Sequence, residues 1–195
     1  MKKMFITMGV FACLLSVGGA TIWAQPKPEA KPEAKKAAAP LSPASKEAEF
    51  VWKRAKQWTL QYIDAMPEEA LNYKPVPEVR SFAEQMLHLA FWNYGLTDAL
   101  ADKPSPYGKK QEDLEKRDDL KKKAALRKIV EESYDFVLAL LPKYDETQWA
   151  ERVTFFTSNV PRRLILTVAL DHQTHHRGQT TMYLRLKGIT PPPEP

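Results

Sequence analysis

Cysteine is nearly absent from this chain of 195 residues, in which Cys13 is the only one. Cys13 lies in an apolar N-terminal segment that we expect to be removed, so the mature protein would have neither a thiol nor a disulfide. This excludes cysteine nucleophiles and thiolate metal ligands. It also suits an oxidising compartment, where a free thiol is a liability.

The chain also lacks a basic stripe interleaved with aromatic side chains, which is the pattern of a nucleic-acid-binding surface. Its formal net charge is +5, and residues 1–24 contribute two lysines and no acid to that balance. The lysines at 121–123 follow Asp118 and Asp119, and such mixed charges indicate the solvated face of a helix. We therefore predict no nucleic-acid partner.

Residues 1–24 have the parts of an export signal. Two lysines start the segment, residues 4–17 form an uncharged apolar core, and small residues lead to a cleavage site after Ala24. The uncharged stretch is also long enough to span a bilayer as an uncleaved anchor. Two glycines and an alanine at 18–20 thin out its hydrophobicity, which favours cleavage. We predict a periplasmic or secreted protein with no stable membrane insertion after cleavage, and an uncleaved anchor is the less favoured alternative.

Residues 25–44 form a segment of low complexity. The sequence Lys-Pro-Glu-Ala at 27–30 is repeated at 31–34, and an alanine run and further prolines follow. Because the segment has many prolines and no apolar periodicity, it is predicted to be a disordered linker. The folded domain is then expected over residues 45–192.

Four segments of this domain have helical periodicity. They cover about 45–66, 81–101, 118–141 and 161–188. Ser81 and Glu84 have the spacing of a capping box at the start of the second segment. No segment shows sustained alternation of apolar and polar residues, so no strand is expected. The pattern predicts an all-α fold, a four-helix bundle.

Three of the four histidines fall within residues 172–176, and His88 is the fourth. His172 and His176 are four residues apart on the fourth predicted helix, so both imidazoles project from one face. Two such nitrogens can bind one divalent metal ion, and a third imidazole from another helix would complete three protein ligands. Three ligands with an open position are typical of a reactive metal site rather than a closed structural one. The simpler alternative is that each histidine is a hydrogen-bonded core or rim residue.

A helical wheel centred on His172 places the pair on the inward face of the fourth helix. At about 100° per residue, the residues within roughly 40° of that direction are Ile165, Val168, His176, Gln179, Tyr183 and Leu186. The residues expected to point away are Gln173, Thr174, Arg177 and Arg185. Two buried, unpaired imidazoles would cost about 1–3 kcal/mol each, and a shared metal ion would satisfy both.

The same construction places the other two histidines away from the centre of their faces. His88 is predicted on the flank of the buried face of the second helix, where a groove would open. His175 lies off the central stripe and is expected to make hydrogen bonds behind the ligands or to solvent. If the triad is a metal site, its ligand nitrogens should lie within about 3–4 Å of one another.

The segment 172–179, with Tyr183 to Arg185 and Gly188 to Pro191, resembles the DinB/YfiT-like family of metalloenzymes. Residues 75–90 resemble the second-helix motif of that family, and the resemblance covers about residues 45–192. It implies a four-helix bundle with long crossovers and a divalent metal ion held by three histidines from two helices.

Carried over by position, the metal ligands are His88, His172 and His176. Nickel, zinc and iron all bind neutral imidazole, so the identity of the ion stays open. Arg177 and Gln179 match the family signature. Gln179 is expected to support the ligands, and Arg177 is expected to have a structural role, pairing with an acid on a neighbouring helix.

The resemblance also implies chemistry on a small molecule. Characterised members include transferases and isomerases that use a cytosolic thiol, which an exported chain would not meet. Metal chemistry alone, with a bound water of lowered pKa, is the alternative. We therefore expect an exported metal-dependent hydrolase or transferase acting on a small molecule. A non-catalytic metal- or ligand-binding module of the cell envelope and a bundle that binds nothing are the competing hypotheses.

The catalytic residues and the assembly are less defined by the sequence. Glu84, already expected to cap a helix, and the pair Glu131 and Glu132 are carboxylates from which a general base could come, and no catalytic residue is assigned. A homodimer is compatible with such a bundle.

Overall fold

The computed structural model describes residues 40–101, 105, 107 and 112–195. The predicted export signal at 1–24 lies outside the described residues, as does most of the predicted linker at 25–44. Within the described ranges, no helix is both long enough and apolar enough to cross a membrane.

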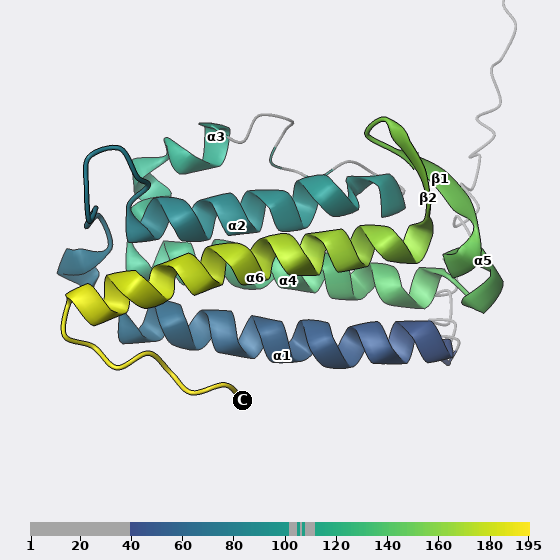
Figure 1. The fold of residues 1–195 in the computed structure, drawn as a ribbon, viewed down its shortest axis with the longest axis horizontal. Coiled ribbons are helices and arrows are strands. Elements are labelled where there is room, and N and C mark those ends of the chain that lie inside the picture. The colour runs from purple at the N-terminus through teal and green to yellow at the C-terminus, as the bar shows by residue number, and fades with distance from the viewer. Residues whose placement is uncertain (1–39, 102–104, 106, 108–111) are drawn as a thin grey trace, which may run out of the picture. The chain divides into compact units, whose positions relative to one another are not determined.

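Four long helices run side by side in the described part of the chain (Figure 1). They are α1 (Pro43–Ala65), α2 (Phe82–Thr97), α4 (Lys123–Leu140) and α6 (Arg162–Leu186). Helix α2 packs on α4 and α6, and α1 packs on the same two helices. Successive helices α1 and α2 therefore occupy opposite corners of a four-helix bundle, and the chain must cross over between them. The predicted helical bundle is confirmed.

The ends of the helices follow local capping chemistry. The Ser81 hydroxyl accepts a hydrogen bond from the Glu84 backbone N–H, and the Glu84 carboxylate accepts one from the Ser81 N–H at 2.8 Å. This confirms the predicted capping box. Helix α1 begins at Pro43, two residues before the predicted start of the domain. The predicted second and third helices are shorter than expected, because residues 98–100 and 118–121 form tighter 3₁₀ turns.

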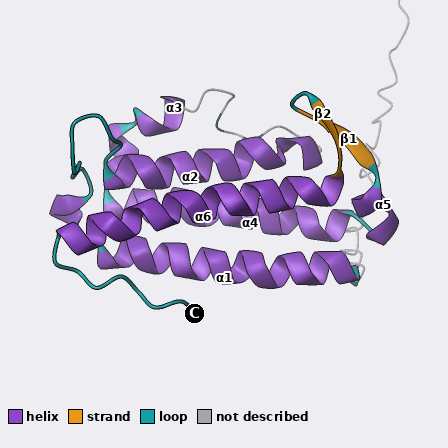
Figure 2. Ribbon diagram, in the orientation of Figure 1, coloured by secondary structure: helices purple, strands orange, loops and turns teal. Residues whose placement is uncertain are grey.

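A short β-hairpin between α5 (Glu146–Ala150) and α6 departs from the all-α prediction (Figure 2). Strand β1 (Arg152–Phe155) pairs antiparallel with β2 (Ser158–Pro161), with Val153 opposite Val160. Strands of four residues are too short to produce a clear alternation in the sequence. The two-residue turn also lacks the usual glycine or asparagine, and Phe156 adopts a positive φ of 52° instead.

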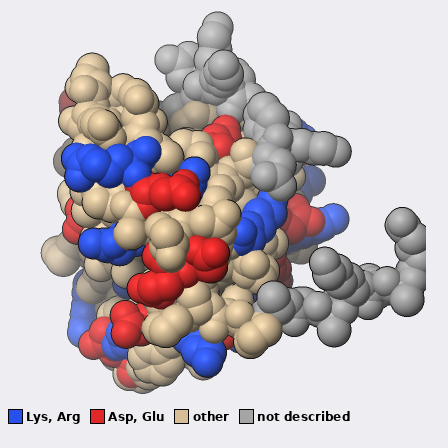
Figure 3. Space-filling model, turned by 90° about the vertical axis from the view of Figure 1, so that its right-hand side faces the viewer, with Lys and Arg blue, Asp and Glu red and all other residues tan. Residues whose placement is uncertain are grey.

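Ion pairs attach this hairpin end of the molecule to the bundle. The Arg162 guanidinium at the start of α6 lies 2.5 Å from the Glu151 carboxylate, and it also stacks 4.8 Å from the centre of the Tyr144 ring. Figure 3 shows this end of the bundle, where basic and acidic side chains are interspersed. The start of α6 is thereby fixed, and the direction of α6 determines where its histidines lie.

Candidate metal centre

The packing of α2 against α6 brings together the three histidines predicted as metal ligands. His88 comes from α2, whereas His172 and His176 lie one turn apart on α6. The ring centre of His88 is 4.3 Å from that of His176 and 5.2 Å from that of His172, and the two α6 rings are 4.5 Å apart. One ring nitrogen from each residue lies within 4.8 Å of the other two.

This spacing is close to that of three ligands on one ion. Nitrogens that each lie about 2.0–2.1 Å from zinc are roughly 3–4 Å from one another, and the three nitrogens of the cluster all lie within 4.8 Å of one another. His172 is the residue with freedom to adjust, because its buried Nδ1 has no hydrogen-bond partner among the described residues. A divalent ion would complete this cluster of imidazoles, and the donor set suits nickel, zinc or iron.

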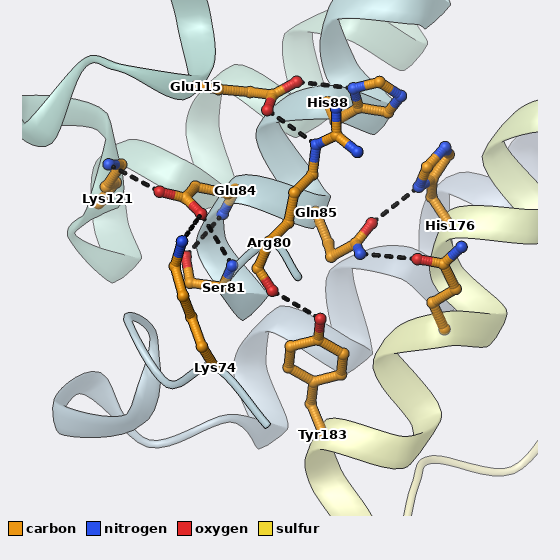
Figure 4. A network of polar contacts seen from close by, with 11 residues as sticks. Lys74, Arg80, Ser81, Glu84, Gln85, His88, Glu115, Lys121, His176 and Tyr183 are labelled. Atoms are coloured by element: carbon orange, nitrogen blue, oxygen red, sulfur yellow. Dashed lines mark hydrogen bonds and ion pairs between the residues drawn. The ribbon is translucent and has the colours of Figure 1, made fainter. Parts of the chain in front are cut away.

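Glu115, at the end of α3 (Glu112–Glu115), orients His88 from behind (Figure 4). A Glu115 carboxylate oxygen lies 2.6 Å from His88 Nδ1, and the other oxygen accepts a hydrogen bond of 2.8 Å from Arg80 Nε. Because an ionised carboxylate only accepts, the His88 proton sits on Nδ1 and Nε2 keeps its lone pair for a metal ion. Sequence reasoning missed Glu115, since it lies 27 residues from His88 in a short helix with no periodic pattern.

A chain of amide groups orients His176 in the same way. Gln85 Nε2 donates a hydrogen bond of 2.6 Å to the Gln179 oxygen, which leaves the Gln85 oxygen to accept from His176 Nδ1 at 2.8 Å. Gln179 Nε2 in turn lies 2.6 Å from the ring nitrogen Nε2 of His175, which is exposed and outside the cluster. Gln179 and His175 therefore lie behind the clustered histidines, as expected. Gln85 was not identified from the sequence.

Burial and mutual repulsion keep the two α6 ligands neutral. Desolvation, and then the neighbouring His88, lower the pKa of His172 to about 4 and that of His176 to about 3. Histidine binds metal ions in its neutral form, so no proton has to be removed from either ring near pH 7. These two rings can therefore bind a cation without first losing a proton.

The buried face of α6 differs from the helical-wheel prediction. Gln173 and Arg177, expected to point outward, are 0% and 5% exposed, whereas Leu186, expected to face inward, is 55% exposed. His172 is therefore at the edge of the buried stripe, and His88, predicted on a flank, is only 6% exposed. The physical reason is that Gln173 and Arg177 find polar partners inside the bundle, and that α3 covers the His88 side of α2.

Arg177 does not pair with an acid in the described residues, contrary to the prediction. Its guanidinium donates to the Gln173 side-chain oxygen at 2.7 Å and to the Thr59 hydroxyl at 3.3 Å. It also lies 4.4 Å from the centre of the Trp58 ring. Burial lowers the pKa of Arg177, and the aromatic face and neutral oxygens compensate part of that cost. Arg177 has the structural role that was expected, through neutral partners.

A cleft of about 600 Å³ opens beside the cluster. It is lined by Arg80, His88, Trp92, Leu96, Phe156, Val168, Asp171, His172 and His175. The carboxylates considered as general bases from the sequence are occupied elsewhere, because Glu84 pairs with Lys74 and Lys121, Glu131 pairs with Lys56, and Glu132 pairs with Lys128. Among the residues that line the cleft, Asp171 supplies the carboxylate. One side of the histidine cluster therefore faces a space of the size of a small molecule.

The position of Glu115 leads to a prediction about metal affinity. Glu115→Ala should weaken metal binding by about 10–100-fold, because His88 loses the acceptor that fixes its ring and its tautomer. Calorimetric titration of zinc into the metal-free protein measures this effect. Glu132→Ala, which removes an exposed carboxylate on α4, is the matched control and should bind zinc as the unsubstituted protein does. Equal affinities for the two variants would show that Glu115 does not support the site.

Comparison with solved structures shows the same fold. A DinB-like protein from Bacillus cereus ATCC 10987 superimposes with a TM-score of 0.61 at 18% identity, over 76% of this chain and 95% of that one. YfiT from Bacillus subtilis, described as a probable metal-dependent hydrolase with an unusual four-helix bundle topology, gives a TM-score of 0.60 at 15% identity. That alignment covers 81% of this chain and 95% of YfiT. At such identities the likeness extends to the fold alone.

Sequence comparison identifies the family. The uncharacterized protein YrdA of Bacillus subtilis (strain 168) is 37% identical over 57 residues, which are 29% of this chain and 34% of YrdA. The sequence model of the DinB family matches residues 46–194, a range that contains all four long helices apart from the first residues of α1. From this match, which includes the three clustered histidines, the chain belongs to the DinB family.

Proposed function

We propose that this protein is an exported metal-dependent hydrolase that acts on a small molecule through a divalent ion held by His88, His172 and His176. The observation that carries the proposal is the convergence of three imidazoles, each on a bundle helix, at the side of an open cleft. The description of YfiT as a probable metal-dependent hydrolase supports the choice of reaction. A purely structural cluster would not require an adjacent cleft.

The residues of the site have separate roles in this proposal. A bound divalent ion would supply a Lewis acid and a water of lowered pKa. His88 and His176 would bind the ion through Nε2, because Glu115 and Gln85 accept their Nδ1 protons. Asp171 lines the same cleft, and we assign its carboxylate to accept the proton of the attacking nucleophile.

Metal content tests the ligand assignment. Protein purified without an affinity tag and then incubated with nickel, zinc or iron(II) should retain one ion per chain after desalting. His88→Ala and His176→Ala should lose that ion, whereas His175→Ala, a neighbouring exposed histidine outside the cluster, should keep it. Retention of the ion by the first two variants would overturn the ligand assignment.

Hydrolysis of a panel of small esters and amides tests the reaction. Activity should disappear on chelation, return with the metal ion and fall by about 100-fold or more in Asp171→Asn, whose metal content stays unchanged. Metal-loaded protein that hydrolyses no member of the panel would favour the alternative, a non-catalytic metal-binding module of the cell envelope.

Export is the part of the proposal that rests on the sequence alone. The charged start, apolar core and small residues before Gln25 support cleavage and a periplasmic or secreted location. Determination of the N-terminus of the mature protein checks this, with Gln25 expected as the first residue. An intact Met1 on protein recovered from the cytoplasm would contradict it.

A further inference from the structure

Arg80 is a charged residue in the cleft that the metal site does not use. Its backbone oxygen accepts a hydrogen bond of 2.6 Å from the Tyr183 hydroxyl, and its Nε donates to Glu115 at 2.8 Å. These contacts fix the backbone oxygen and the Nε of Arg80. Its two terminal nitrogens make no hydrogen bond within the described part of the chain. The side chain is 36% exposed, and Figure 4 shows the guanidinium beside His88.

Such a guanidinium is prepared to bind an anion. Two terminal N–H groups in one plane match the two oxygens of a carboxylate, and the resulting charge-assisted bonds are among the strongest in proteins. Glu115 does not occupy the terminal nitrogens of Arg80. One of its oxygens accepts from Arg80 Nε, and the other accepts the proton of His88. Arg80 can therefore bind an anionic group while it keeps its contact with Glu115.

One part of the cleft wall is apolar and aromatic, apart from the histidines and Asp171. Trp92 lies with its ring centre 5.5 Å from that of His172, and Leu96 and Val168 continue the wall on the two helices. Phe156 adds a further aromatic side chain from the turn of the hairpin. This apolar part of the wall thus combines side chains from α2, α6 and the hairpin.

Phe156 lies in the two-residue turn of the hairpin, at the edge of the cleft. Its φ of 52° is the positive value that such a turn requires. The residue is 70% exposed, so its aromatic side chain is accessible to a ligand in the cleft.

We propose that the cleft binds a small organic acid, with its carboxylate on Arg80 and its apolar or aromatic body against Trp92 and Phe156. This inference rests on the proposed function, since it places the acid beside the histidine cluster. The cleft volume of about 600 Å³ limits the ligand to a small molecule. A singly charged carboxylate fits better than a phosphate ester, because Glu115 and Asp171 already bring two carboxylates to this region.

Calorimetry on the zinc-loaded protein tests this assignment with four probes. Phenylacetate should bind about tenfold or more tightly than phenylacetamide, which has the same shape without the charge. It should also bind about tenfold more tightly than acetate, which has the charge without the apolar body. Tighter binding of phenyl phosphate than of phenylacetate would overturn the choice of a carboxylate.

Variants separate Arg80 and Phe156 from the metal ion, which could itself attract a carboxylate. Arg80→Gln should abolish the preference for phenylacetate over phenylacetamide, and Arg80→Lys should retain part of it. Phe156→Ala should weaken phenylacetate binding by about fivefold. The matched controls are Arg163→Gln, an exposed arginine of α6, and Phe50→Ala, a ring that is also 70% exposed. Both controls should leave binding unchanged.

Zinc content, measured on every sample, distinguishes a failure of the proposed metal site from a failure of the organic-acid inference. One zinc ion per chain with equal affinities for phenylacetate and phenylacetamide would overturn the organic-acid inference and leave the metal site standing. If zinc is absent or Arg80→Gln loses it, the comparison is repeated on metal-free proteins. There, a preference for phenylacetate that depends on Arg80 would support the inference, and no such preference would overturn it.

Discussion

Saturating zinc is expected to raise the free energy of unfolding of this protein by about 4 kcal/mol, when the free ion is 1,000-fold above its dissociation constant. The reason is that the three ligands lie together only in the folded bundle. In the sequence, His88 and His172 are separated by many residues, which include the whole of α4. The unfolded chain therefore has no site with three imidazoles at bonding distance. Binding energy therefore becomes folding energy.

The expected thermal shift is large enough to measure directly. For a folded domain of this size, 1 kcal/mol corresponds to about 2–4 °C, so Tm should rise by roughly 10 °C. Circular dichroism at 222 nm with and without zinc, and with nickel in parallel, gives the shift. His88→Ala and His176→Ala should show little shift, whereas His175→Ala should behave as the unsubstituted protein. A full shift in His88→Ala would mean that zinc binds elsewhere.

Gln173→Leu is expected to destabilise the fold by about 3 kcal/mol, although the substitution places a larger apolar surface in a buried position. The Gln173 side-chain oxygen accepts hydrogen bonds of 2.7 Å from both the Tyr134 hydroxyl and the Arg177 guanidinium. Tyr134 is 0% exposed and Arg177 is 5% exposed, so water is a poor alternative acceptor for either donor. Loss of the acceptor leaves the buried Arg177 cation with the Trp58 ring and one weaker hydrogen-bond acceptor, the Thr59 hydroxyl at 3.3 Å.

A double variant distinguishes this explanation from a packing defect. Gln173→Leu combined with Arg177→Met removes the unpaired cation, so it should be more stable than Gln173→Leu alone by about 1 kcal/mol or more. Gln57→Leu, the same change at an exposed position of α1, should alter stability by less than about 0.5 kcal/mol. Urea unfolding measures these three variants and Arg177→Met alone. A double variant that loses the sum of both single effects would indicate packing instead of unpaired charge.

Much of the bundle can be predicted from local patterns in the sequence. Helical periodicity identifies four long helices, because each must bury one apolar face, and the spacing of Ser81 and Glu84 identifies the start of α2 through hydrogen bonds between near neighbours. The hairpin escapes such reasoning, since strands of four residues have little periodicity and the turn at Phe156 uses an unfavourable backbone conformation.

The burial of two polar residues of α6, Gln173 and Arg177, was not predicted from the sequence. A wheel calculation assumes that polar side chains face water, and it therefore turned Gln173 and Arg177 outward. In the bundle these two residues lie inside, because Tyr134, Thr59 and Trp58 on other helices supply a hydrogen-bond donor, an accepting hydroxyl and an aromatic face. Whether a polar group can be buried depends on partners that are distant in sequence.

By itself the sequence determined the helices, the family resemblance and the pairing of His172 with His176, since all of these depend on spacing along one element. Only the tertiary structure decided that His88 meets them, that Glu115 and Gln85 set the tautomers of His88 and His176, and that the cluster faces a cleft. The physical reason is that these contacts join α2, α3 and α6 across loops of irregular structure. Their positions follow from how the helices pack, which no local pattern encodes.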